Sequence, residues 1–166
     1  MKTGQDFLKS QVNNAVMLHK EFLESLKSHA SEADDRRFAE LCNRFIPIMT
    51  QHQGELEQYQ RRLGGQGEGT VKRIIGRVAE AGKDLVDSAR QDDFLRLVQD
   101  IVMARQAEDT FKTFREAGRT LGIDELERLG DKAERDHDAY VEEANQLAQT
   151  FFVEHVRAGQ PASARV

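Results

Sequence analysis

The sequence predicts an all-α protein whose core is a bundle of four long helices. Apolar residues recur every three or four positions over four long stretches, which is the period of an amphipathic helix. Ala, Glu, Leu, Arg and Gln are abundant, and the 166 residues include two prolines and no tryptophan. This composition disfavours a sandwich or a barrel. We expect one domain over residues 1–158, followed by a disordered tail at 159–166.

The first two long helices are predicted at about residues 5–29 and 32–63. Ser31 is the expected N-cap of the second helix, because serine accepts backbone N–H groups at helix starts and acidic residues follow it. Pro47 lies inside the second helix and is expected to kink it, since proline removes a backbone hydrogen bond. The short turn between the two helices predicts an antiparallel pair.

A glycine-rich connector at residues 64–69 ends the second helix. It lacks the Gly-Lys-Ser/Thr ending and the preceding strand of a phosphate loop, so we interpret it as a helix connector. A shorter helix at about 71–89 follows. Two further long helices are predicted at about 91–121 and 124–156, separated by a stop at Gly122. The prediction is therefore two antiparallel pairs joined by a long crossover that carries a short extra helix.

Composition and charge restrict the classes of partner. The formal net charge of −5 does not attract nucleic acid over the whole surface. The single cysteine, Cys42, excludes an intramolecular disulfide, fits a reducing compartment and lies beside an apolar stripe as a small core residue. No segment resembles a signal peptide or approaches the roughly 18 apolar residues of a membrane span. We therefore expect a cytoplasmic protein without a membrane or nucleic-acid partner.

Residues of the types that bind metals interrupt the apolar stripes. A charged carboxylate is rarely buried unless it is paired or ligates an ion, so a carboxylate between apolar neighbours is informative. Imidazole together with carboxylate suits iron, manganese or zinc better than calcium. The interrupting residues are His19, His52, Glu108 and His137, with Glu134 and Glu55 flanking two of them.

The helical rise places several of these residues at one depth. Counted from the turn at Gly122, Glu108 and His137 lie roughly 21–23 Å along the bundle. On the same count Glu134 lies at roughly 18 Å and His52 at roughly 14 Å. The predicted metal ligands are therefore His52, Glu108, Glu134 and His137. His19, about 10 Å away on this count, and Glu55 are the weaker candidates.

Over about residues 7–156 the chain resembles the ferritin-like superfamily, and more narrowly the small stress-associated ferritin-like proteins of bacteria. The family pattern has Glu on the first and third helices and Glu-x-x-His on the second and fourth. Glu134-Arg135-Asp136-His137 matches the fourth helix, Glu108 the third and His52 the histidine of the second. Met49 and His19 stand where the pattern has Glu. The resemblance implies a bundle-core site for one or two ions, iron or manganese, that at most oxidises metal with oxygen or peroxide.

Two functional interpretations remain open at this stage. In one, the bundle binds metal through the residues named above. In the other, the bundle is a metal-free structural or interaction protein in which His137 pairs with Glu108, and His52 with Glu134 or Glu55. Asp136 and the helix-end His29 are expected at the surface. The patch at residues 151–153 is either core or the contact of a homodimer formed through a bundle face.

Overall fold

The computed structural model describes residues 3–64 and 92–159 and contains four long helices with no strand in these residues. The prediction of an all-α protein with four long helices is confirmed for the described residues. The helices are α1 (Gly4–Glu32), α2 (Arg36–Arg62), α4 (Asp93–Leu121) and α5 (Asp124–Ala158). Residues 65–69 of the connector predicted at 64–69, the helix predicted at 71–89 and residues 160–166 of the tail predicted at 159–166 lie outside the described residues. Within the described part, no helix combines the length and hydropathy needed to cross a membrane.

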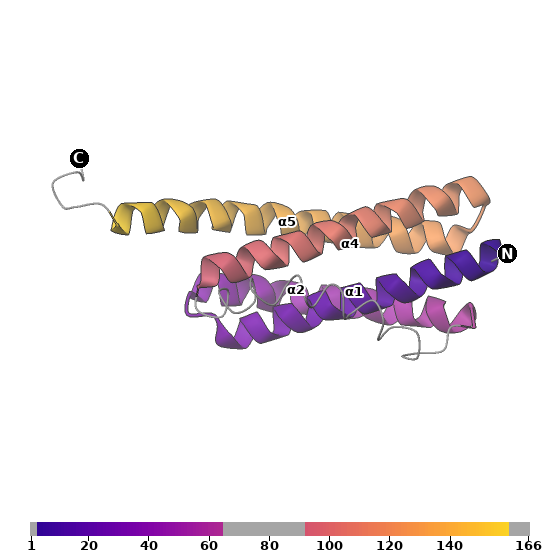
Figure 1. Cartoon of the computed structure of the whole chain (residues 1–166), viewed down its shortest axis with the longest axis horizontal. Helices are drawn as coiled ribbons and strands as arrows, with labels where there is room; N and C mark the ends of the chain where they lie inside the picture. The colour runs from indigo at the N-terminus through magenta and orange to yellow at the C-terminus, as the bar shows by residue number, and fades with distance from the viewer. Residues whose placement is uncertain (1–2, 65–91, 160–166) are drawn as a thin grey trace.

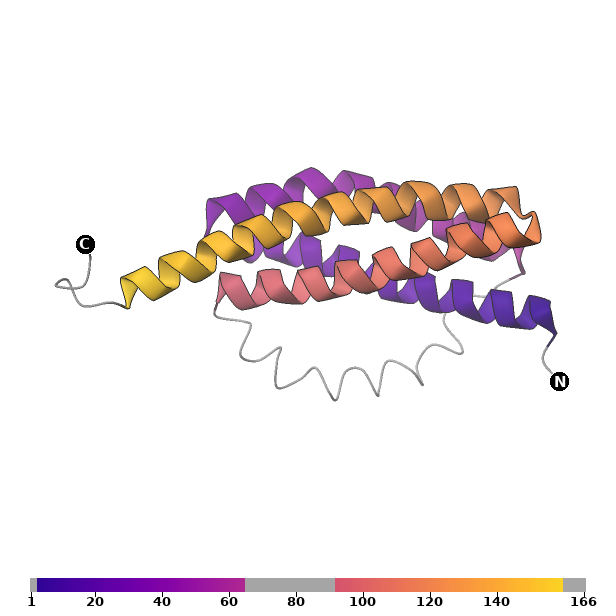
Figure 2. The ribbon, with the colours of Figure 1, turned by 90° about the horizontal axis from the view of Figure 1, so that it is seen from above.

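The four helices pack as two neighbouring pairs. α1 and α2 lie side by side, as do α4 and α5, and one pair lies against the other (Figure 1). Seen from above, the C-terminal end of α5 extends past the end of the bundle (Figure 2). Phe152, Val153 and Val156 on this end are exposed.

The helix starts are fixed by side-chain caps. Thr3 and Asp6 form a reciprocal capping box at the start of α1, and Asp35 accepts from the Arg37 N–H at the start of α2. The predicted cap at Ser31 is wrong. Ser31 lies in the last turn of α1, where its hydroxyl donates to the Ser28 carbonyl over 2.8 Å. The turn therefore falls a few residues later than the sequence suggested.

Helices α4 and α5 pack closely because Gly118 and Gly130 each face the backbone of the other helix. Gly122 ends α4 in the left-handed conformation that glycine adopts without strain. A Cβ on Gly118 would lie 2.3 Å from the Glu127 nitrogen, and one on Gly130 would lie 2.4 Å from the Arg115 nitrogen. Any larger residue at either site must push the two helices apart.

The core consists of two apolar clusters on either side of a polar layer. One cluster includes Phe22, Met49 and Tyr140, and the other includes Ala15, Leu56 and Ala133. Between them on α1, α2 and α5 stand His19, His52 and His137, which we call the histidine layer. All three side chains are buried. Each of these helices thus contributes one imidazole to the same level of the bundle.

The sequence placed Ile101 and Glu108 on the inner face of α4, and both positions are wrong by one residue. The buried residues of α4 follow a regular alternation of three and four: Leu97, Asp100, Ala104, Ala107, Phe111, Phe114 and Gly118. Ile101 and Glu108 each follow a buried residue and are only partly buried. Phe111, not Glu108, is the residue through which α4 meets the histidine layer.

Candidate metal centre

The histidine layer is a set of aromatic contacts around His137. The His137 ring centroid lies 5.0 Å from that of His19 and 5.9 Å from that of His52. The Phe111 ring of α4 closes the layer, with its centroid 5.1 Å from His137 and 5.7 Å from His19. Imidazoles from three helices therefore meet in an interior otherwise lined by apolar groups.

Gln53 determines which nitrogen of His19 carries the proton. The Gln53 amide nitrogen donates to the Val16 carbonyl and to Glu57 Oε1, which can only accept. The amide oxygen is therefore the atom that lies 2.8 Å from His19 Nδ1. That oxygen accepts only, so Nδ1 carries the proton and Nε2 of the neutral ring keeps its lone pair.

The other two rings are held in the same way by groups that only accept. His137 Nδ1 donates to the Ala133 carbonyl over 2.6 Å, which leaves the lone pair on its Nε2. His52 Nε2 donates to the Asp136 carboxylate over 2.7 Å, which leaves the lone pair of the neutral ring on Nδ1. Asp136 was expected at the surface. Its carboxylate is one-third exposed but reaches across to α2.

Each ring of the layer has one nitrogen without a hydrogen-bond partner. Among the described residues, His19 Nε2, His52 Nδ1 and His137 Nε2 are all buried and unpartnered. Burial lowers the pKa of His19 to about 4 and that of His137 to about 3, because a charged ring would lose its hydration. The neighbouring imidazoles add to this lowering. At neutral pH both rings are therefore neutral bases, the form that binds metals.

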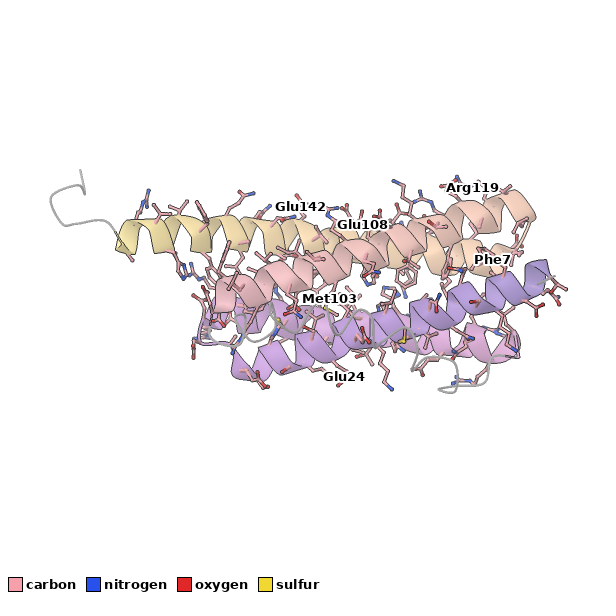
Figure 3. The ribbon with its side chains drawn as sticks, viewed as in Figure 1. Phe7, Glu24, Met103, Glu108, Arg119 and Glu142 are labelled. Carbon is pink, nitrogen blue, oxygen red and sulfur yellow. The ribbon has the colours of Figure 1, made fainter. Side chains whose placement is uncertain are left out.

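The two glutamates predicted as ligands lie apart from the unpartnered nitrogens. Glu108 pairs with Arg105 on its own helix at 2.8 Å. In Figure 3 Glu108 lies on the side of α4 that faces away from α1 and α2. Glu134 pairs with Arg115 of α4. Of the four residues predicted as ligands, the structure brings His52 and His137 together. Glu108 and Glu134 form ion pairs with arginines instead.

The two weaker candidates lie nearer to the layer. His19 touches His137, although the sequence estimate placed it about 10 Å away. The estimate was wrong because it set the α1–α2 turn too early. Each residue of error in the turn changes the relative depth of the two helices by about 3 Å. Glu55 Oε2 lies 4.0 Å from His52 Nδ1, one of the unpartnered nitrogens.

A second buried polar group, which we call the Asp100 cluster, was missed. The Asp100 carboxylate is fully buried and accepts from the Ser25 hydroxyl at 2.6 Å and from His29 Nδ1 at 2.7 Å. His29, predicted at the surface, is 9% exposed. Asp100 also raises the pKa of the buried Tyr140 hydroxyl, after burial itself. The sequence does carry a signal for the burial of Asp100, because this residue lies three residues after Leu97 and four before Ala104, the spacing of one helix face.

The predicted small-core role of Cys42 is confirmed, since its side chain is fully buried and burial raises the pKa of its thiol. Over residues 3–64 and 92–159 no set of three or more His, Cys, Asp or Glu side chains stands in the arrangement of a formed metal site.

Comparison with protein-family models, with curated protein sequences and with solved structures finds no match to this chain.

Proposed function

We propose that this chain binds one divalent transition-metal ion at the histidine layer, inside a bundle of ferritin-like arrangement. The observation that carries the proposal is the set of buried, unpartnered nitrogens on His19, His52 and His137. The partners of the opposite nitrogens leave a lone pair on each. A buried polar atom without a partner is costly, and three lone pairs of the same kind call for a cation or a donor.

The spacing of the rings is close to what a shared ion requires. A zinc–nitrogen bond of about 2.0–2.1 Å and tetrahedral angles place two bound imidazole centroids about 5 Å apart. The observed separations from His137 are 5.0 and 5.9 Å. Because the side chains do not stand in a formed site, the proposal requires the rings to rotate toward a common point when the ion binds.

The available donors indicate which metals fit. The carboxylate-rich iron or manganese site implied by the family pattern does not fit, because Glu108 and Glu134 form ion pairs with Arg105 and Arg115. Imidazole suits zinc, copper, iron and nickel, whereas manganese prefers oxygen ligands. We propose zinc or ferrous iron, with Glu55, whose Oε2 lies 4.0 Å from His52 Nδ1, as the candidate carboxylate ligand. An ion bound there supplies Lewis acidity or, for iron, redox chemistry, and the chain supplies geometry and exclusion of water.

Metal analysis tests the proposal. Protein purified without a histidine tag is stripped with a chelator, loaded with Zn²⁺, Fe²⁺ or Mn²⁺ without oxygen, desalted and analysed for metal. We expect about one zinc or iron per chain and little manganese. His137→Phe should lose the ion, and Glu108→Ala should retain it as a matched control. Wild-type protein that keeps well below one equivalent of every metal would contradict the proposal.

The metal-free interpretation is the second candidate, and the lack of a formed ligand set in the described residues favours it. In that case the histidine layer is a polar level that enforces one alignment of the helices, as buried polar networks do in some bundles. His137→Phe then changes packing and stability but alters no metal content, so the same experiment separates the two functions.

A further inference from the structure

We propose that Asp136 is a positioning residue that makes Nδ1, rather than Nε2, the metal-binding nitrogen of His52. This inference rests on the proposed function. Its first observation is the 2.7 Å hydrogen bond between Asp136 on α5 and His52 Nε2 on α2. A carboxylate group without a proton only accepts, so it holds the ring proton on Nε2.

His52 is the ring of the histidine layer that has a carboxylate near each nitrogen. Glu55 Oε2 lies 4.0 Å from His52 Nδ1, beyond hydrogen-bond distance, whereas Asp136 lies 2.7 Å from Nε2. Asp136 therefore decides which nitrogen carries the proton. In the other two rings the Gln53 oxygen and the Ala133 carbonyl fix the proton on Nδ1. The layer thus presents two Nε2 atoms and one Nδ1 atom.

Asn at position 136 would remove this preference. Its amide oxygen can accept from a protonated His52 Nε2, and its NH₂ group can donate to an unprotonated Nε2, so both His52 tautomers become available. A protonated Nδ1 cannot bind an ion without first losing that proton. Outer partners of metal-binding histidines commonly contribute 10–100-fold to affinity, about the size of effect expected here.

Asp138→Asn is the matched control. Asp138 lies two residues further along α5, its carboxylate is 63% exposed, and its ion pair is with Arg105 at 3.8 Å. The same chemical change is thereby made on the same helix without touching the histidine layer. Asp136→Glu keeps an acceptor and should restore the wild-type behaviour. Asp136→Ala removes the acceptor without adding a donor and should give a mixture of the two tautomers.

Two measurements test the inference. Long-range ¹H–¹⁵N correlation spectra of the metal-free proteins report which His52 nitrogen carries the proton, and competition with a coloured chelator reports zinc affinity. We expect the proton on Nε2 in wild type and a mixture of the two tautomers in Asp136→Asn and Asp136→Ala, with zinc binding weakened about 10–100-fold. The His19 and His137 tautomers should stay unchanged, which a general packing defect would not preserve.

A single Nε2-protonated tautomer of His52 in Asp136→Ala, or zinc binding by that variant as tight as in wild type, would overturn the inference. Failure of the proposed function looks different. In that case the wild type binds no zinc, and the tautomers alone decide whether Asp136 directs the His52 proton. If Asp136→Ala does not fold, Asp136→Leu supplies the same comparison.

Discussion

The imidazole of His19 on α1 packs against that of His137 on α5, with ring centroids 5.0 Å apart and planes at 63°. Both rings are buried, and His19 disfavours a charge on His137. Two neutral bases in an apolar interior resist protonation until the helices separate. This contact links the stability of the bundle to pH as well as to the candidate metal site.

We predict that the bundle loses stability as the pH falls from about 6.5 toward 4. The folded pKa values of about 4 for His19 and 3 for His137 lie below the ordinary 6.5. The unfolded chain therefore binds protons first, and folding is fully favoured only above that range. Where both histidines contribute, the unfolding free energy should fall by about 2.5 kcal/mol per pH unit.

Urea unfolding of the metal-free protein at a series of pH values measures this slope. His137→Gln should reduce the slope by about one proton. His155→Gln is the control, because the His155 side chain is 61% exposed, and it should leave the slope unchanged. A flat dependence between pH 6.5 and 4.5 in wild type would contradict buried neutral histidines.

Gly130→Ala should destabilise the protein strongly. The added Cβ would meet the Arg115 nitrogen at 2.4 Å and the Phe111 carbonyl at 2.5 Å, and backbone atoms cannot move aside as side chains do. We expect a loss of about 3 kcal/mol from overpacking between α4 and α5. Gly54→Ala is the matched control. It has nothing within 4 Å of its added Cβ and lies inside α2.

Gly54→Ala should raise the unfolding free energy by up to about 1 kcal/mol, because alanine favours the helix and no contact opposes it. Chemical denaturation measures both variants. Equal effects of the two substitutions would show that α4 and α5 do not approach as closely as described.

Asp100 and His29 should be strongly coupled. Removing either partner leaves a buried polar group without its hydrogen bond, and we expect each alanine variant to cost about 3 kcal/mol. The double variant should cost less than the sum of the two, with a coupling energy of about 1 kcal/mol or more. Denaturation of the four proteins in this double-mutant cycle measures the coupling. If the losses of unfolding free energy in the two single variants simply add in the double variant, Asp100 and His29 do not interact in solution.

Glu108→Ala should change little. Its carboxylate pairs with Arg105, and the side chains are 15% exposed for Glu108 and 51% exposed for Arg105. Water reaches the pair from the arginine side and screens it. We expect a change in unfolding free energy within about 1 kcal/mol. A loss of several kcal/mol by the same denaturation assay would show that Glu108 lies in the core after all.

The comparison of α4 with its sequence shows what amphipathic spacing can predict. The helix and its buried Leu97, Phe111 and Phe114 followed from periodicity. The position of Glu108 did not, because steps of four residues from Leu97 to Ile101 and from Ala104 to Glu108 fit the helical period as well as the observed steps of three. The correct alternation passes through Asp100, which its charge made an improbable core residue. Its partners Ser25 and His29 are 75 and 71 positions away in the sequence.

The candidate site was predicted in part for similar reasons. His52 and His137 lie on regular inner faces, so their burial followed from the local pattern. The pairing of Glu134 with Arg115 depends on a long side chain from the adjacent helix, which no spacing within α5 reveals. The contact between His19 and His137 depends on where the α1–α2 turn falls.

The homodimer expected from the patch at residues 151–153 remains a prediction.

X-ray absorption of the zinc-loaded protein tests most directly whether the histidine layer binds an ion. We predict a shell of nitrogen and oxygen ligands near 2.0–2.1 Å, roughly three of them imidazoles, and loss of this spectrum in His137→Phe. A shell made mainly of carboxylate oxygens, or a spectrum that His137→Phe leaves unchanged, would contradict the account.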